Sequence, residues 1–137
     1  MNQPMRHTII NPEALGAPKG YSNGILAQPG RLLFVAGQIG WDSNQKLVGT
    51  DFVAQFEQAL KNVMVVVTAA GGQAEDICRL TLYVVDKRVY MDAIREVGRT
   101  YRAVMGKHFP TMALVQVADL LEPGAQVEIE ATAVIGN

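Results

Sequence analysis

The chain is poor in the residue types that mark disulfide-stabilised and metal-binding proteins. Its single cysteine, Cys78, excludes an intrachain disulfide, and its position on the apolar side of a predicted strand suggests a buried, inert thiol in a reducing compartment. The two histidines, His7 and His108, are far apart and adjoin no cluster with metal-ligand spacing. No glycine-rich phosphate-binding pattern occurs either. We therefore expect neither a metal nor another cofactor.

Long apolar runs and blocks of like charge are also missing. No stretch approaches the ~20 consecutive apolar residues of a membrane span, and residues 1–6 lack the apolar segment of a secretory signal. The formal net charge of −1, without a basic block, does not provide the electrostatic footprint on which nucleic acid binding depends. We expect a cytoplasmic protein that binds no membrane and for which nucleic acid is an unlikely main partner.

Two segments alternate strictly between apolar and polar residues. In residues 126–134, the two carboxylates Glu128 and Glu130 project from one face while apolar residues project from the other. Residues 77–85 repeat this pattern, with Arg79, Thr81 and Tyr83 on the polar side. Both segments are therefore predicted strands with one face in the core and one polar face.

The remaining segments complete an α+β pattern. The 137 residues contain no repeat or linker, so we expect one domain over residues 1–137. The predicted order is β-β-β-α-β-α-β-β, with two helices on one face of the sheet. Because residues 111–117 are apolar on both sides, the uncovered face is expected to pack against a neighbouring subunit. The other predicted elements are strands near 7–10, 25–28 and 32–36, and helices near 51–70 and 90–104.

Short motifs lie in order over almost the whole chain. They are Gly20-Tyr21-Ser22, Val35-Ala36-Gly37-Gln38, Asn62, Phe109-Pro110, Val115-Gln116-Val117 and Val127-Glu128-Ile129-Glu130-Ala131. Each is weak alone, but their order and spacing agree with the predicted order of elements. Together they resemble the motifs of the RidA/YjgF family of reactive-intermediate deaminases.

The resemblance implies a chorismate-mutase-like fold with a six-stranded sheet, assembled as a homotrimer. Its ligand would be a small molecule held in a cleft between subunits, where enamines or imines are hydrolysed to ketones and ammonia. By position, Glu128 would activate water, Tyr21 would cover the pocket, and the backbone at Gly37 would approach the ligand. Older family labels are endoribonuclease L-PSP and translation inhibitor.

The chain departs from the family pattern where family members active on amino acid imines carry an arginine. The sequence there is Pro110-Thr111-Met112, and a family asparagine falls on Gly98. Methionine cannot replace a charge-assisted contact to a carboxylate. We therefore place Met112 and Leu114 in an apolar substrate-binding wall and expect weak or absent 2-imino acid deaminase activity.

Three functions follow, in order of preference. The first is a hydrolase or deaminase acting on a neutral imine, enamine or related carbonyl compound, with Glu128 as the catalytic residue. The second is a metabolite-binding protein without turnover, and the third, an endoribonuclease or translation inhibitor, rests only on the older label. Two roles stay open: Trp41 either closes the end of the hairpin or lines the cleft, and Arg79 either replaces the lost cation or pairs with Glu130 or Glu128.

Overall fold

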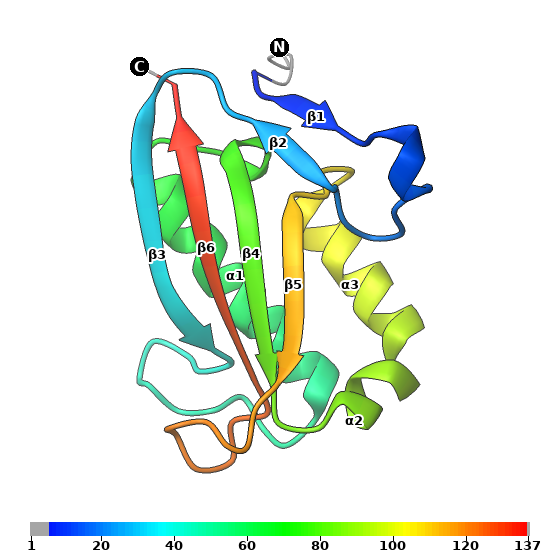
Figure 1. Cartoon of the computed structure of the whole chain (residues 1–137). Helices are drawn as coiled ribbons and strands as arrows, with labels where there is room; N and C mark the ends of the chain where they lie inside the picture. The colour runs from blue at the N-terminus through cyan, green and yellow to red at the C-terminus, as the bar shows by residue number, and fades with distance from the viewer. Residues whose placement is uncertain (1–5, 137) are drawn as a thin grey trace.

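The alternating segments form the centre of a mixed four-stranded sheet with helices on one face (Figure 1). The computed structural model describes residues 6–136. Its elements are β1 (Thr8–Ile10), a 3-10 turn (Glu13–Leu15), β2 (Gly24–Leu26), β3 (Arg31–Ile39), α1 (Phe52–Ala69), a second 3-10 turn (Ala74–Asp76), β4 (Ile77–Val84), α2 (Lys87–Asp92), α3 (Ile94–Met105), β5 (Thr111–Gln116) and β6 (Val127–Ile135).

The strand order in the main sheet is β3-β6-β4-β5, with only β4 and β5 parallel. The α+β class is confirmed, but the chain by itself does not form the predicted six-stranded sheet. Strands β1 and β2 pair with each other instead, and this ribbon is joined to the start of β5 through the Ser22 N–H, which donates to the Pro110 carbonyl at 3.0 Å. Each of these two strands has only three residues. Pro12 follows β1 and Pro29 follows β2, and because proline has no N–H to donate, neither strand continues its ladder of hydrogen bonds.

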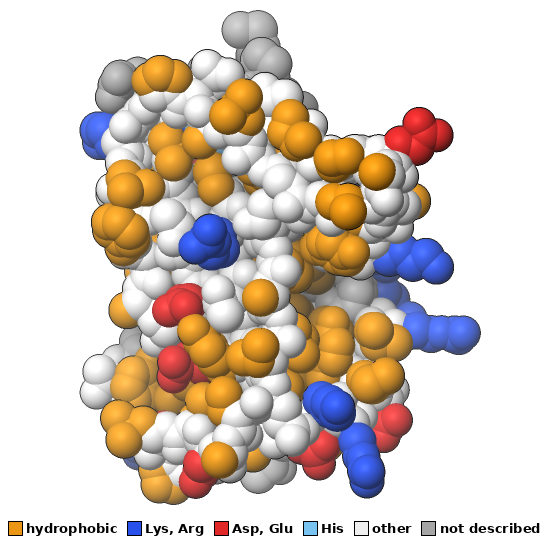
Figure 2. Space-filling model, in the orientation of Figure 1, with side chains coloured by type: hydrophobic (Ala, Val, Ile, Leu, Met, Phe, Trp, Pro, Cys, Tyr) orange, Lys and Arg blue, Asp and Glu red, His pale blue; other side chains and the backbone are white. Residues whose placement is uncertain are grey.

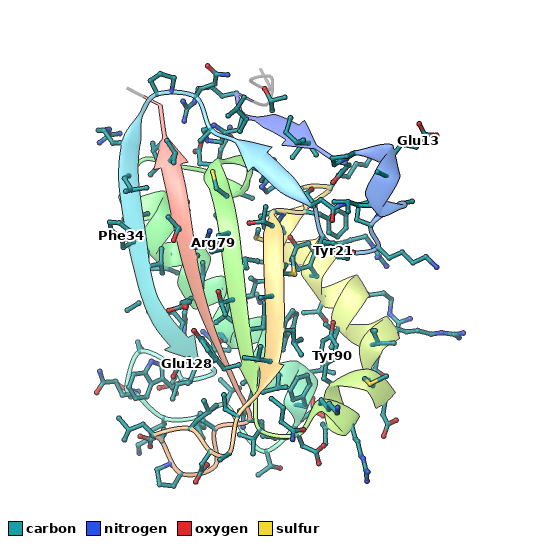
Figure 3. All side chains as sticks on the ribbon, in the orientation of Figure 1. Glu13, Tyr21, Phe34, Arg79, Tyr90 and Glu128 are labelled. Carbon is teal, nitrogen blue, oxygen red and sulfur yellow. The ribbon has the colours of Figure 1, made fainter. Side chains whose placement is uncertain are left out.

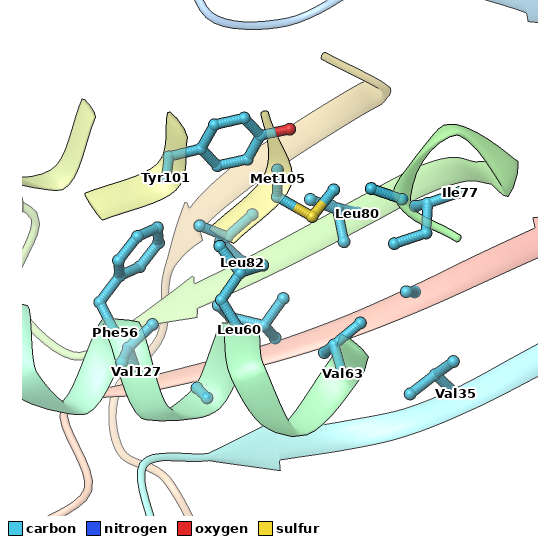
Figure 4. Packing of buried hydrophobic residues seen from close by; sticks show 14 of the residues in the cluster. Val35, Phe56, Leu60, Val63, Ile77, Leu80, Leu82, Tyr101, Met105 and Val127 are labelled. Atoms are coloured by element: carbon cyan, nitrogen blue, oxygen red, sulfur yellow. The ribbon is translucent and has the colours of Figure 1, made fainter. Parts of the chain in front are cut away.

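Helix α1 covers the sheet because its apolar residues recur at helical spacing. The Asp51 side chain caps it by accepting from the Ala54 N–H at 3.0 Å, and Gly71 follows its end with φ +85°. The helix packs against β3, β6 and α3. Its completely buried side chains meet those of the strands in one core (Figure 4), which includes Phe56, Leu60, Val63, Leu80, Leu82, Met105 and Val127.

The predicted second helix is divided in two. Ala93, with φ −100° and ψ 12°, separates α2 from α3. Val97 and Tyr101 of α3 are buried, but Ile94 on the same helix is 52% exposed. All three line one cavity, and Ile94 lies where that cavity is open to solvent.

The alternation in β6 is confirmed, whereas the alternation in β4 begins one residue out of step. Val127, Ile129, Ala131 and Ala133 are all buried, as predicted. In β4, an irregularity between Ile77 and Arg79 puts Ile77 in the core and leaves Cys78 only half-buried, so the prediction of a buried thiol is wrong. Partial burial still raises the pKa of the Cys78 thiol.

Candidate functional site

Polar side chains of β4 and β6 gather on the sheet face opposite the helices, which we call the outer face. The antiparallel register places Tyr83 beside Glu128 and Thr81 beside Glu130. In Figure 3, Arg79 and Glu128 are seen on this face, with α1 behind the sheet. The prediction that the two alternating strands present their polar residues together is therefore confirmed.

A hydrogen bond within the outer face restrains the second carboxylate. The Tyr83 hydroxyl donates to Glu130 Oε1 at 2.7 Å, and this bond is the main cause that raises the pKa of Tyr83. The predicted ion pair is not formed: among residues 6–136, Arg79 pairs with neither Glu130 nor Glu128. Glu130 is thus held by a tyrosine, and no such hydrogen bond to the Glu128 side chain is present among these residues.

Gly37 lies directly against the Glu128 side chain. A bulge in β3 between Val35 and Gln38 brings the glycine over β6, where a Cβ atom on residue 37 would stand 2.5 Å from Glu128 Oε2 and 2.8 Å from Cδ. Real Cβ atoms do not approach other atoms so closely, so any side chain here would displace the carboxylate. The backbone of β3 therefore forms one wall of the space around Glu128.

A mostly apolar cavity of about 470 Å³ lies between β5 and α3, and we call it the β5–α3 cavity. Figure 2 shows hydrophobic side chains in the recess beside β5, with Lys and Arg side chains along its outer margin. Tyr21, Met112 and Leu114 all line it, whereas Gly37, the fourth residue expected to contact the substrate, does not. Its remaining lining residues are Lys19, Gly20, Phe56, Leu60, Leu80, Leu82, Tyr90, Ile94, Val97, Gly98, Tyr101, Arg102, Phe109 and Ile129.

The predicted site residues fall into two groups on opposite sides of one sheet. Met112 pairs with Leu80 and Leu114 with Leu82 in the parallel β4–β5 ladder, so their side chains share the helix-covered face. Glu128 and Gly37 lie on the outer face, and β4 separates β5 from β6. Within a single chain, Met112 therefore cannot meet Glu128 in one pocket.

Lys19, Tyr90 and Arg102 line the cavity but are not among the site residues predicted from the sequence. The available signal was spacing: Ile94, Gly98 and Arg102 follow one another at intervals of four, which places them on one face of α3. That face lines the β5–α3 cavity.

Two other conspicuous residues have structural roles. The Asn62 side chain donates to the carbonyls of Ile39 and Trp41, at 3.2 and 2.9 Å, and ties α1 to the end of β3. Trp41 pairs with Leu47 across the following loop and does not line the β5–α3 cavity. Both alternatives for Trp41, closure of the hairpin end and a wall of the cleft, stay predictions.

Residues 6–136 contain neither a cluster of potential metal ligands nor a membrane-spanning helix. No group of three or more His, Cys, Asp or Glu side chains in this range could hold a metal ion. No helix in the same range combines the length and apolarity needed to cross a membrane.

Comparisons with known proteins agree over nearly the whole chain. The family model described as Endoribonuclease L-PSP matches residues 11–135. The human 2-iminobutanoate/2-iminopropanoate deaminase is 32% identical over 137 residues, covering 99% of this chain and 95% of the human protein. The deaminase of the same name from Salmonella typhimurium is 35% identical, with 95% and 98% covered.

Solved structures show the same relationship. A Rid family protein of unknown function from Yersinia pestis superposes with a TM-score of 0.84 at 35% identity, covering 96% of this chain and 100% of that one. The Escherichia coli protein TdcF, solved with bound serine, gives a TM-score of 0.67 at 30% identity, with 96% and 95% covered. The agreement of family model, relatives and fold shows that this chain belongs to the Endoribonuclease L-PSP family, the RidA/YjgF proteins.

Proposed function

We propose that the protein is a small-molecule deaminase that hydrolyses a neutral imine, enamine or related carbonyl compound. The observation that carries this proposal is the contact between Gly37 and Glu128, which lets a carboxylate lie against the β3 backbone on the outer face, with no cation paired to it among the described residues. Such a carboxylate can accept a proton from water. The relatives from human and Salmonella typhimurium are named as deaminases, which also supports this activity.

The reaction adds water across a carbon–nitrogen double bond. In the proposed mechanism, Glu128 accepts a proton from water as the water oxygen attacks the imine carbon, and the π electron pair moves to nitrogen. The proton then passes to nitrogen and gives a carbinolamine. Glu128 next accepts the proton of the carbinolamine hydroxyl and delivers it to nitrogen, so that the carbon–nitrogen bond breaks, ammonia leaves and the carbonyl forms. Glu128 returns to its ionised state, so the cycle balances without a cofactor.

A homotrimer would unite the two groups of residues. In this arrangement, the β5–α3 cavity of one subunit, with Tyr21, Met112 and Leu114, faces the outer face of the next, with Gly37 and Glu128. The exposed apolar side chains of the outer face support burial against a copy, since Phe34 is 73% and Leu32 58% exposed. The catalytic carboxylate and the substrate wall then come from different chains.

Met112 sets the expected substrate preference. The β5–α3 cavity has no arginine at this position, so an acid group next to the reacting carbon would have no bidentate partner on β5. We expect little hydrolysis of 2-iminopropanoate by the wild type and faster hydrolysis after Met112→Arg. A gain of about tenfold or more corresponds to one hydrogen bond to a charged group.

The experiment compares ammonia release from two imines generated in the assay. The benzylamine imine, formed by a flavin amine oxidase, serves as the neutral substrate, and 2-iminopropanoate, formed by an amino acid oxidase, as the acidic one. Glu128→Gln should abolish both activities, and Met112→Leu is the matched control for packing. Rapid hydrolysis of 2-iminopropanoate by the wild type would refute the preference, and equal rates for wild type and Glu128→Gln would refute the catalytic role.

The second candidate is a binding protein without turnover. It is favoured by the apolar character of the cavity, in which Met112 and Leu114 also pack against the core. If the wild type binds a small ketone in this cavity but releases no ammonia from either imine, this function replaces the first. The cytoplasmic location stays a prediction from the sequence.

A further inference from the structure

The β5–α3 cavity has an apolar floor and a cationic mouth. Phe56, Leu60 and Leu80 form part of its floor and are at most 1% exposed. Lys19 and Arg102 also line it but are exposed, so their charged groups lie where the cavity opens to solvent. No Asp or Glu is among the described residues that line the cavity, which therefore carries only positive formal charge.

Gly98 gives Arg102 its position at this mouth. The two residues are one helical turn apart on the cavity face of α3, and the guanidinium extends back over the glycine. A Cβ atom on residue 98 would lie 3.5 Å from Arg102 Nη1, so a longer side chain there would occupy the space that the guanidinium now uses. The two ion pairs found among residues 6–136 involve neither Arg102 nor Lys19.

From these observations we infer that the β5–α3 cavity selects a small molecule with an apolar body and a carboxylate, and that Arg102, assisted by Lys19, binds this carboxylate at the mouth. The volume of about 470 Å³ lies within the usual range for pockets that bind small molecules. The planar guanidinium can bind a carboxylate through two parallel hydrogen bonds, whereas Lys19 contributes a point charge.

This inference deepens the proposed function by naming the substrate class, a compound that is uncharged around its imine or enamine group and carries a carboxylate elsewhere. The inference rests on the proposed function for the reaction that the bound molecule undergoes. The binding of the carboxylate by Arg102 does not depend on that function. Met112 requires an uncharged neighbourhood at the reacting carbon, while Arg102 places a carboxylate at the far end of an apolar body. The cation that selects the ligand is thereby located on helix α3 instead of strand β5.

The test measures binding by calorimetry with two probes of nearly equal shape, 4-phenylbutanoate and its neutral amide, 4-phenylbutanamide. The wild type should bind the acid about tenfold more tightly than the amide. This difference in binding free energy lies near the lower limit for a hydrogen bond to a charged group, because the mouth of the cavity is open to water. Arg102→Gln should remove this preference and leave the affinity for the amide unchanged. Added salt should weaken binding of the acid only.

The matched control is Arg99→Gln. Arg99 is an exposed arginine of the same helix that does not line the β5–α3 cavity, so its loss removes the same charge without changing the mouth. Lys19→Gln should reduce the preference partly. Equal binding of acid and amide by the wild type would overturn the inference, as would a preference that survives Arg102→Gln, an equal loss in Arg99→Gln, or failure of both probes to bind at millimolar concentration.

Failure of this inference and failure of the proposed function give different results. A wild type that prefers the acid through Arg102 but releases no ammonia from imines supports the binding inference and refutes the deaminase. Ammonia release that depends on Glu128, without any preference for the acid, refutes the inference alone.

Discussion

At the scale of single residues, the Glu128 carboxylate depends on the absence of a side chain at residue 37. Gly37 has no positive φ, so it is needed for space and not for an unusual backbone conformation. The sequence predicted that Glu128 faces away from the core, and the resemblance placed Gly37 near the ligand. Their direct contact depends on the bulge in β3, which alternation along a single strand cannot reveal.

Gly37→Ala should displace the Glu128 carboxylate and lower the deaminase rate about a hundredfold, the loss that a misplacement of about 1 Å can cause. Gly37→Val should do the same and also weaken ligand binding or assembly. The measurement is the rate of ammonia release from the benzylamine imine, with thermal unfolding to confirm that the variant is folded.

The control is Gly24→Ala, also in a strand, where a Cβ atom would lie 3.6 Å from the nearest atoms of Ile10, an ordinary contact. This variant should keep its activity. Wild-type activity in Gly37→Ala would show that the carboxylate can move without consequence, and that the glycine serves only the bulge.

At the scale of elements, the junction of α3 and β5 determines the shape of the cavity. The Tyr101 hydroxyl donates to the His108 carbonyl at 2.7 Å, and its ring stacks on Phe109 with 5.1 Å between centroids. The His108 ring in turn bonds to the Ile77 carbonyl at 2.7 Å, with its Nε2–H as the donor. These buried contacts connect α3 to the starts of β4 and β5.

Tyr101→Phe should lower the free energy of unfolding by about 1–2 kcal/mol, because the His108 carbonyl loses a buried donor. Burial also raises the pKa of Tyr101 above the ordinary value of about 10. As the pH rises through about 10, the unfolded state therefore loses the Tyr101 proton while the folded state retains it. The contribution of Tyr101 is therefore complete below about pH 10 and decreases as the pH rises further.

Urea unfolding at about pH 8 and about pH 10.5, on either side of the ordinary tyrosine pKa, tests both effects. The wild type should lose more stability between the two pH values than Tyr101→Phe. Part of the loss should persist in the variant, because burial also raises the pKa of Tyr90. An identical loss in both proteins would contradict the assignment to Tyr101.

At the scale of the whole molecule, helices on one face and exposed apolar groups on the other indicate a missing partner surface. Phe34 pairs with Thr132 and lies on the outer face, where Val115 of the edge strand is 43% exposed. We predict a homotrimer of three chains of 14.9 kDa at micromolar concentration, detected by light scattering. A stable monomer would contradict both the trimer and the shared site.

Phe34→Glu should dissociate the trimer by placing a charge in the buried interface. It should also abolish the deaminase activity, because the cavity and Glu128 would then separate. Leu121→Glu is the control, since Leu121 is 99% exposed on the loop before β6 and should leave the mass and the activity unchanged. A trimeric Phe34→Glu variant would locate the interface elsewhere.

The sequence by itself determined which residues of β6 enter the core, since side chains alternate along a strand whatever surrounds it. It also determined α1, through apolar residues at helical spacing, and the loss of a cation at Met112. Only the tertiary structure decided that Met112 and Glu128 lie on opposite faces of one sheet, because this depends on the parallel pairing of β5 with β4. It also decided that Ile94, Gly98 and Arg102 border a cavity, since spacing identifies the face of a helix but not what that face meets.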